Sequence, residues 1–192
     1  INKADFVSCS NQSYVFKYNV LEGLKPGSTF LLNTIWSPEE VETHLPAAYK
    51  RYIANNDIKF YTINAVKIAQ EIGLGGRTNM IMQSAFFKLA NIIPIDDAIK
   101  YLKDSVVTSY GKKGQKVVDM NNAAIDKGVE SLVKIEIPES WKDAVDEEVA
   151  PIKNASDFVK DIVIPMNRQE GDSLPVSTFI GMEDGTFEAG TA

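Results

Sequence analysis

The chain has 192 residues, of which 44% are hydrophobic, so it can bury one substantial core. No stretch approaches the roughly 20 consecutive apolar residues that a membrane-spanning helix needs, and residues 1–5 lack the pattern of a signal peptide. Cys9 is the only cysteine, which excludes an internal disulfide and a site ligated by several cysteines within this sequence. These features predict a cytoplasmic protein with no membrane partner.

The net charge of −6 is unevenly distributed along the chain. Residues 139–192 contain 12 acidic and 4 basic residues, whereas residues 1–138 contain 14 acidic and 16 basic residues. A nucleic-acid-binding protein would need a basic stripe, so we expect no nucleic-acid partner. The shift in composition predicts a globular domain over residues 1–138, and a linker over residues 139–192 that leads into a following domain.

The first third of the chain predicts three buried strands, over residues 4–8, 29–35 and 58–63. A helix capped by Ser10 or Asn11 is expected between the first two strands, reaching residue 21 and ending before Gly23. After the second strand, Ser37 begins a capping box with proline at the first helical position, and a further helix is expected from Pro46.

The rest of the globular part predicts helices over residues 66–72, 80–90, 94–106 and 116–132, then a fourth strand over residues 133–138. The segment over residues 80–90 is apolar almost all the way round, which predicts burial on most sides. After Pro138 only residues 157–165 suggest a short ordered segment. Alternating strands and helices predict an α/β fold: an open, mainly parallel, doubly wound, Rossmann-like sheet with an extended C-terminal linker.

Candidate ligand-binding positions follow the three strands, because ligands of open parallel sheets bind at the carboxyl ends of the strands, beside helix N-termini. These positions are residues 9–11, 34–37 and 64–65. Residues 9–11 have the most suitable composition for an anion or a ribose. The alternative is that Ser10 and Asn11 only cap their helix.

Glycines at residues 73, 75 and 76 lie between two predicted helices, and not between a strand and a helix as in a dinucleotide-binding fingerprint. A helix C-cap is therefore favoured over a phosphate cradle. Arg77 either pairs with a structural carboxylate or binds a phosphate, and the sequence leaves both open. His44 is expected to be solvated. We expect no catalytic residue and no metal site, because no nucleophile or base has activating partners nearby.

Several segments carry a family resemblance that extends over nearly the whole chain. They are ADFVSCSN at residues 4–11, FYTINA at residues 60–65, GGRTNMIMQSAFFK at residues 75–88, and residues 171–191. Together they closely resemble the gamma-type domain of single-chain pyruvate:ferredoxin (flavodoxin) oxidoreductases. The sequence starts without methionine, so we interpret it as a piece of a longer polypeptide that lacks the first βα unit and the glycine-rich loop of that domain.

The resemblance implies an enzyme that oxidatively decarboxylates pyruvate, forms acetyl-coenzyme A and CO₂, and reduces ferredoxin or flavodoxin. In that family thiamine diphosphate, Mg²⁺ and [4Fe–4S] clusters are held by other domains, so no cofactor is expected within this piece. The resemblance further implies a homodimer and contacts with other domains of the same polypeptide. The gamma-type domain is associated with binding coenzyme A and closing over the thiamine site. On this interpretation, the candidate coenzyme A-binding residues are Asn11, Asn64, Arg77 and Asn79, and the piece alone is expected to be inactive.

Two other interpretations remain open at the level of the sequence. The domain could be a scaffold without a ligand, which positions the thiamine and iron–sulfur domains and has residues 73–90 as its packing core. It could also be a nucleotide-binding regulatory module that shares only the architecture, although a shared fold alone carries no function.

Overall fold

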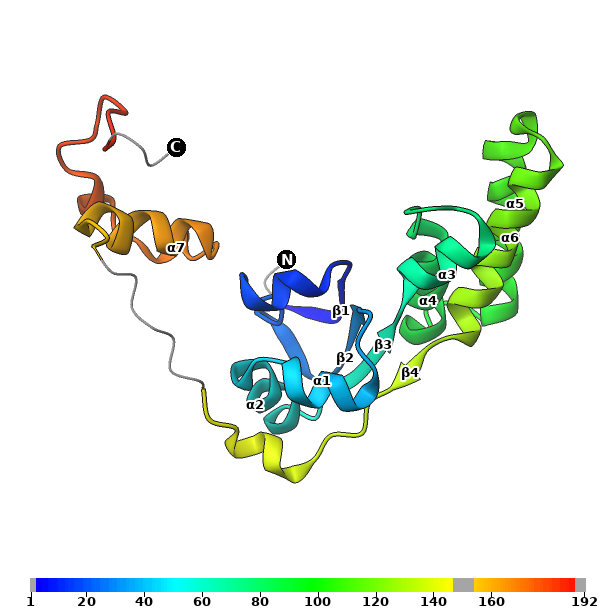
Figure 1. Cartoon of the computed structure of the whole chain (residues 1–192), viewed down its shortest axis with the longest axis horizontal. Coiled ribbons are helices and arrows are strands. Elements are labelled where there is room, and N and C mark those ends of the chain that lie inside the picture. The colour runs from blue at the N-terminus through cyan, green and yellow to red at the C-terminus, as the bar shows by residue number, and fades with distance from the viewer. Residues whose placement is uncertain (1–2, 147–153, 189–192) are drawn as a thin grey trace.

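The structure is a computed structural model that describes residues 3–146 and 154–188. Its centre is an open four-stranded sheet in the order β1-β2-β3-β4 (Figure 1). The strands are β1 (Ala4–Cys9), β2 (Leu24–Asn33), β3 (Lys59–Ile63) and β4 (Val133–Lys134). The first three strands are parallel to one another, and β4 is antiparallel to β3. The predicted α/β class with an open, mainly parallel sheet is confirmed.

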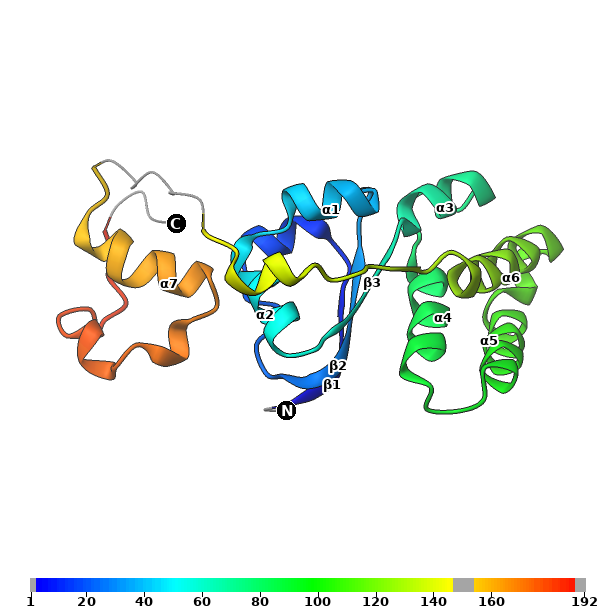
Figure 2. The same ribbon diagram turned by 90° about the horizontal axis from the view of Figure 1, so that it is seen from below.

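Helices cover both faces of this sheet (Figure 2). The helical segments before β3 are the 3₁₀ helix η1 (Gln12–Phe16), α1 (Pro38–His44) and α2 (Ala47–Asn55). Those between β3 and β4 are α3 (Ala65–Ile72), α4 (Asn79–Ala90), α5 (Ile95–Tyr110), η2 (Gly111–Lys113) and α6 (Gln115–Glu130). The C-terminal segments are η3 (Glu139–Asp143), the π-helical η4 (Val159–Val163), α7 (Ile164–Asn167), η5 (Gly171–Ser173) and η6 (Val176–Phe179).

Alternate residues of β2 supply the two main cores. Phe30 and Leu32 pack with residues of α1 and α2 on one face, while Leu31 packs with residues of α3, α4 and α6 on the other. All three side chains are fully buried, and such burial contributes roughly 1.5–3 kcal/mol for each large apolar side chain. β2 is therefore a central strand that is apolar on both faces, as its sequence predicts.

The helix predicted up to residue 21 is wrong in type and length, because only η1 forms there. Its Asn11 cap is confirmed, since the Asn11 side chain accepts a hydrogen bond from the Ser13 backbone N–H. Beyond η1, the Tyr49 hydroxyl on α2 donates to the Tyr18 carbonyl and accepts from the Val20 N–H. These two bonds use backbone groups that a longer helix would need, and they turn the chain toward β2.

The predicted fourth strand over residues 133–138 is also shorter than expected and has the opposite direction. Only Val133 and Lys134 form β4, opposite Thr62 and Tyr61 of β3. The chain leaves α6 beside the carboxyl end of β3 and runs back along it, since the Ile135 N–H next reaches the Phe60 carbonyl. A return in this direction needs no further crossover, so an antiparallel pair results.

α4 is less deeply buried than its largely apolar sequence predicts. Ile81, Ser84 and Ala85 are buried against α6 and the sheet, but Met82, Phe86 and Leu89 keep partial exposure. Met82 and Leu89 still pack against one core, and Phe87 packs with residues of α5 and α6, so burial on most sides is confirmed in part.

The residues after β4 begin with a segment that packs on α2 (Figure 1). Trp141 of η3 is 3% exposed, Arg51 of α2 donates to the Ala144 carbonyl, and Asn55 donates to the Lys142 carbonyl. The short ordered segment predicted over residues 157–165 is helical. The parts of the predicted linker over residues 147–153 and 189–192 lie outside the described residues.

Candidate functional site

Asn33 joins the ends of all three parallel strands. This residue is the last of β2 and is 6% exposed. Its amide nitrogen donates to the Ser10 carbonyl just after β1, at 3.0 Å, and its oxygen accepts from the Ala65 N–H just after β3, at 3.0 Å. Because both bonds go to backbone groups, they fix the orientation of the amide and hold the three strand ends together.

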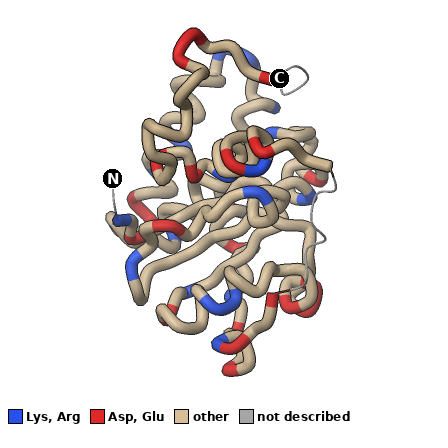
Figure 3. The backbone as a smooth tube through the Cα atoms, turned by 90° about the vertical axis from the view of Figure 1, so that its left-hand side faces the viewer, with Lys and Arg blue, Asp and Glu red and all other residues tan. Residues whose placement is uncertain are grey.

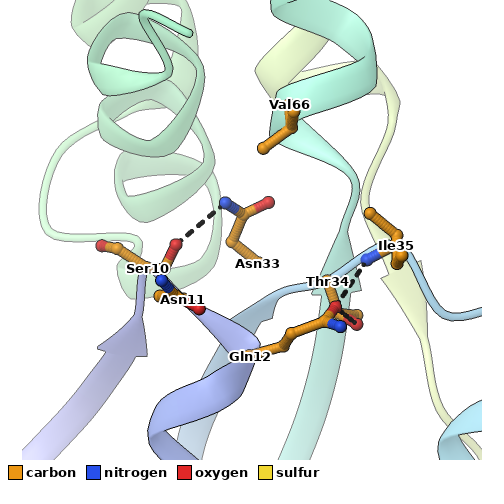
Figure 4. A pocket seen from close by; sticks show the side chains of 7 residues that line it. All are labelled: Ser10, Asn11, Gln12, Asn33, Thr34, Ile35 and Val66. Atoms are coloured by element: carbon orange, nitrogen blue, oxygen red, sulfur yellow. Dashed lines mark hydrogen bonds between the residues drawn. The ribbon is translucent and has the colours of Figure 1, made fainter.

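A cavity of about 300 Å³ opens at this edge of the sheet (Figure 4). Its walls carry polar side chains after β1 and β2 and two apolar side chains, with no charged residue: Ser10, Asn11, Gln12, Asn33, Thr34, Ile35 and Val66. The Gln12 side-chain oxygen accepts from the Thr34 hydroxyl at 2.6 Å and from the Ile35 N–H at 3.0 Å. Among the residues that the structure describes, none accepts a hydrogen bond from the Gln12 amide nitrogen.

A second cavity, of about 420 Å³, shares Thr34 and Ile35 with the first and lies between α1 and α3. The charged side chains in its walls are Glu40, Lys67 and Glu71. The Lys67 ammonium lies 3.9 Å from the Glu71 carboxylate, one turn further along α3. The charge at this second cavity is therefore more negative than positive.

Two of the four candidate residues, Asn11 and Asn64, lie at these cavities, one in each. Each uses its side-chain oxygen as a helix cap: Asn11 accepts from the Ser13 N–H, and Asn64 accepts from the Lys67 N–H at 2.9 Å. In the described part of the chain, neither amide nitrogen has an acceptor. The capping alternative is thus confirmed for Asn11, and a hydrogen-bond donor is left over on each side chain.

Arg77 and Asn79 line neither of these cavities, and both are exposed. The preceding Gly73 adopts a left-handed conformation, with φ of 89°, and caps α3, as the sequence predicts. Over residues 3–146 and 154–188, the Arg77 guanidinium has no hydrogen-bond or ion-pair partner. The pairing with a structural carboxylate that the sequence left open is therefore not observed among these residues.

Cys9, the last residue of β1, has a buried thiol and is 3% exposed. Burial raises the pKa of Cys9 above its ordinary value, and the neutral thiol donates a hydrogen bond to the Asn11 carbonyl, 3.2 Å away. A thiol held in its neutral form is a poor nucleophile, so Cys9 has the structural role that its sequence context suggests.

Asn33 and Gln12 give the edge its geometry, and neither was among the candidate residues predicted from the sequence. The available signal for Asn33 was an amide at the end of an otherwise apolar strand. Gln12 gave no such signal, because a glutamine in the first turn of a surface helix is ordinary. Its importance depends on a contact with Thr34 and Ile35, which lie more than 20 positions further along the chain.

The described residues also bear on metal binding and on membrane spanning. No cluster of three or more histidine, cysteine or acidic side chains could hold a metal ion there, and no described helix is long and apolar enough to cross a membrane. Figure 3 shows acidic and basic residues interspersed along the backbone.

Comparison with solved structures supports the fold. A pyruvate oxidoreductase subunit PORC from Thermotoga maritima is similar over 71% of this chain and 67% of its own length, with a TM-score of 0.54 and 21% sequence identity.

Curated relatives are much more similar in sequence. The chain is 65% identical to a pyruvate-flavodoxin oxidoreductase of Enterobacter agglomerans and 56% identical to a pyruvate:ferredoxin oxidoreductase of Moorella thermoacetica. It is 37% identical to a mitochondrial pyruvate dehydrogenase [NADP(+)] of Euglena gracilis. Each match covers the whole of this chain, which spans 16%, 16% and 10% of these three relatives, respectively.

Two family models match along the chain. Residues 146–192 match a domain of unknown function, and residues 1–131 match the model described as pyruvate ferredoxin/flavodoxin oxidoreductase. The domain boundary predicted at residue 138 lies between the two matches and stays a prediction. The match over residues 1–131 covers more than half of the sequence, so the chain belongs to the pyruvate ferredoxin/flavodoxin oxidoreductase family.

Proposed function

We propose that this chain serves coenzyme A binding and interdomain closure in an enzyme that converts pyruvate and coenzyme A to acetyl-coenzyme A and CO₂. The observation that carries the proposal is the cavity at the carboxyl edge of the sheet, where the amide donors of Asn11 and Gln12 have no acceptor among the described residues. Ligands of open α/β sheets bind at this edge. Membership of the family supports the choice of reaction.

The chemistry of decarboxylation and electron transfer is assigned to other parts of the parent enzyme. Thiamine diphosphate with Mg²⁺ and [4Fe–4S] clusters would supply it, with ferredoxin or flavodoxin as electron acceptor. We further propose contacts with other domains of the same polypeptide, a homodimeric parent enzyme and a cytoplasmic location. The isolated chain would then be inactive and would act as a binding element.

A full-length enzyme that contains this stretch tests the proposal directly. Replacing Val66, which lines the cavity and is 38% exposed, with tryptophan would fill the space between α3 and the strand ends. The expected result is a rise of about tenfold or more in the KM for coenzyme A, equivalent to about 1.4 kcal/mol of lost binding. Decarboxylation of pyruvate without coenzyme A should be unchanged.

The matched control is Val107→Trp, because Val107 is an exposed valine on α5 outside the cavity. An unchanged KM for coenzyme A in the Val66 variant, with its fold intact, would contradict the proposal.

The competing function is a scaffold without a ligand. A substitution of Arg77 distinguishes this function from coenzyme A binding. The scaffold hypothesis expects Arg77→Ala to lower thermal stability, whereas exposed residues without partners change the free energy of unfolding by no more than about 0.5 kcal/mol. We expect an unchanged melting temperature and a raised KM for coenzyme A. Arg168→Ala, another exposed arginine, is the control. A lowered melting temperature with an unchanged KM would favour the scaffold.

A further inference from the structure

The cavity formed by Ser10, Asn11, Gln12, Asn33, Thr34, Ile35 and Val66 has a chemistry that selects one part of a ligand, and we call it the amide cavity. We infer that the amide cavity binds an uncharged, amide-bearing chain, which is the pantetheine arm if the ligand is coenzyme A, and that it does not bind the phosphates. The identification of the arm rests on the function proposed above. The pantetheine end of coenzyme A, and not its phosphate end, would then bind at this edge of the sheet.

The amide cavity has no positive charge in its walls. None of the seven residues that line the amide cavity is charged. In the neighbouring cavity, the one cation, Lys67, lies beside Glu71, and Glu40 lies in the same wall. Phosphate sites in proteins rely on arginine or lysine, or on unpaired N–H groups at the end of a helix.

The helix N-terminus nearest to the amide cavity cannot replace a cation. At the start of α3, the Ala65 N–H donates to Asn33 and the Lys67 N–H donates to Asn64. These backbone donors are therefore already used inside the protein, and a phosphate would find few of them free.

The polar groups of the amide cavity that are left for a ligand are hydrogen-bond donors. The side-chain oxygens of Asn11 and Gln12 accept from the backbone N–H groups of Ser13 and Ile35, which fixes both amide orientations. Among the described residues, the groups left for a ligand are these two amide nitrogens and the Ser10 hydroxyl, all of which are uncharged donors (Figure 4). Their natural partners are neutral carbonyl or hydroxyl oxygens, such as those of the two amide bonds and the pantoyl group of pantetheine.

The size and the apolar walls of the amide cavity fit an arm of a ligand. A volume of about 300 Å³ is at the lower limit for small-molecule sites, so the amide cavity can hold an arm but not a complete dinucleotide-sized ligand. Ile35 is 66% exposed and Val66 is 38% exposed, and both face the same space. These apolar walls would cover the gem-dimethyl and methylene groups of the arm.

Three ligands separate the alternatives on the 192-residue chain: pantetheine, adenosine 3′,5′-bisphosphate and coenzyme A. In ¹H–¹⁵N spectra, pantetheine and coenzyme A should both shift the side-chain amide signals of Asn11 and Gln12 in a saturable manner. The bisphosphate should leave these signals in place. Shifts of these signals by the bisphosphate but not by pantetheine would overturn the inference and leave the proposed function standing.

Two further outcomes are distinguishable in the same experiment. Shifts with pantetheine but none with coenzyme A would retain an arm-binding cavity and contradict coenzyme A as its ligand. No shift with any of the three ligands would overturn the inference as well as coenzyme A binding by this chain.

Variants that change only the donor provide a second measurement. Gln12→Glu and Asn11→Asp keep the oxygens that hold Ile35 and Ser13, but replace each free donor by an acceptor with a negative charge. Each should weaken pantetheine binding about tenfold or more. Gln83→Glu, on the exposed side of α4, is the matched control and should bind normally. Unchanged pantetheine affinity in both cavity variants would overturn the inference.

Discussion

Asn33 connects the ends of the three parallel strands at the candidate site. The residue is 6% exposed, and its side-chain amide bonds to two backbone groups that follow neighbouring strands. From the sequence, the three strand ends could be identified as one edge, because parallel strands share their direction. The sequence could not identify Asn33 as the residue that joins them, because an asparagine at the end of a strand gives no indication of its hydrogen-bond partners.

Replacing Asn33 with leucine keeps a similar volume but leaves the Ala65 N–H and the Ser10 carbonyl without this partner. A buried polar group that loses its hydrogen bond costs about 1–3 kcal/mol. Ala65 is buried whereas Ser10 is exposed, so we expect the free energy of unfolding to fall by about 1–3 kcal/mol, mainly through the Ala65 N–H. Urea denaturation of the two proteins measures the difference. Asn19→Leu, at an exposed asparagine, is the control. A loss of less than about 1 kcal/mol would contradict the bridging role.

Tyr49 provides a prediction about alkaline pH. Burial raises the pKa of Tyr49 from its usual value near 10 to about 12, with the hydrogen bond from the Val20 N–H acting in the opposite direction. The unfolded chain therefore releases this proton at a lower pH than the folded chain. Stability is retained below pH 10 and is lost as the pH rises from 10 toward 12, on the order of 2 kcal/mol in total.

Tyr49→Phe should remove this part of the pH dependence and should also be less stable at neutral pH, because the Tyr18 carbonyl loses its donor. Thermal unfolding at pH 8, 10 and 11 in the two proteins gives the comparison. A wild-type stability that stays constant between pH 10 and 11, relative to the variant, would disprove the assignment.

At the scale of elements, α6 packs closely on α4 at Gly128. A Cβ atom added at Gly128 would lie 2.1 Å from the Ser84 hydroxyl oxygen and 2.3 Å from the Ile81 carbonyl oxygen. Both distances are far shorter than real contacts, so a larger residue would force the helices apart. The sequence predicted both helices, but not that their approach depends on a glycine.

Gly128→Ala should therefore destabilise the protein by about 1–3 kcal/mol, although alanine is the better helix former. Gly111→Ala, at a surface position where an added Cβ meets no other atom within 4 Å, should be close to neutral. Differential scanning calorimetry of the two variants tests this order. Equal melting temperatures for both variants would contradict the close packing of α4 and α6.

The boundaries of the elements show what local patterns can predict. The capping box at Ser37 forms with both of its hydrogen bonds, since all of its groups lie within four residues. By contrast, the helix expected up to residue 21 does not form, because the Tyr49 hydroxyl bonds to backbone groups that the helix would need. The fourth strand runs antiparallel to β3 because α6 ends beside the carboxyl end of β3. Errors of this kind arise where contacts between distant residues determine the local structure.

For the whole molecule, the alternation of strands and helices was enough to predict an open α/β sheet with parallel strands. The amide cavity could not be predicted in the same way, because it needs residues from three segments to meet: 10–12, 33–35 and 66. Asn11 and Asn64 were identified by their place after strands, and they lie at this edge. Arg77 and Asn79 are exposed and outside the two cavities, so their part in coenzyme A binding stays a prediction.

The central claim is that the carboxyl edge of the sheet selects coenzyme A. Its most direct test is a titration of the chain with coenzyme A in ¹H–¹⁵N spectra, with ATP and NADPH as parallel controls. We expect saturable shifts with coenzyme A for Asn11, Gln12 and Asn64, and no comparable shifts with either nucleotide. Silence at these residues with coenzyme A, or equal shifts with all three ligands, would contradict a coenzyme A site at this edge.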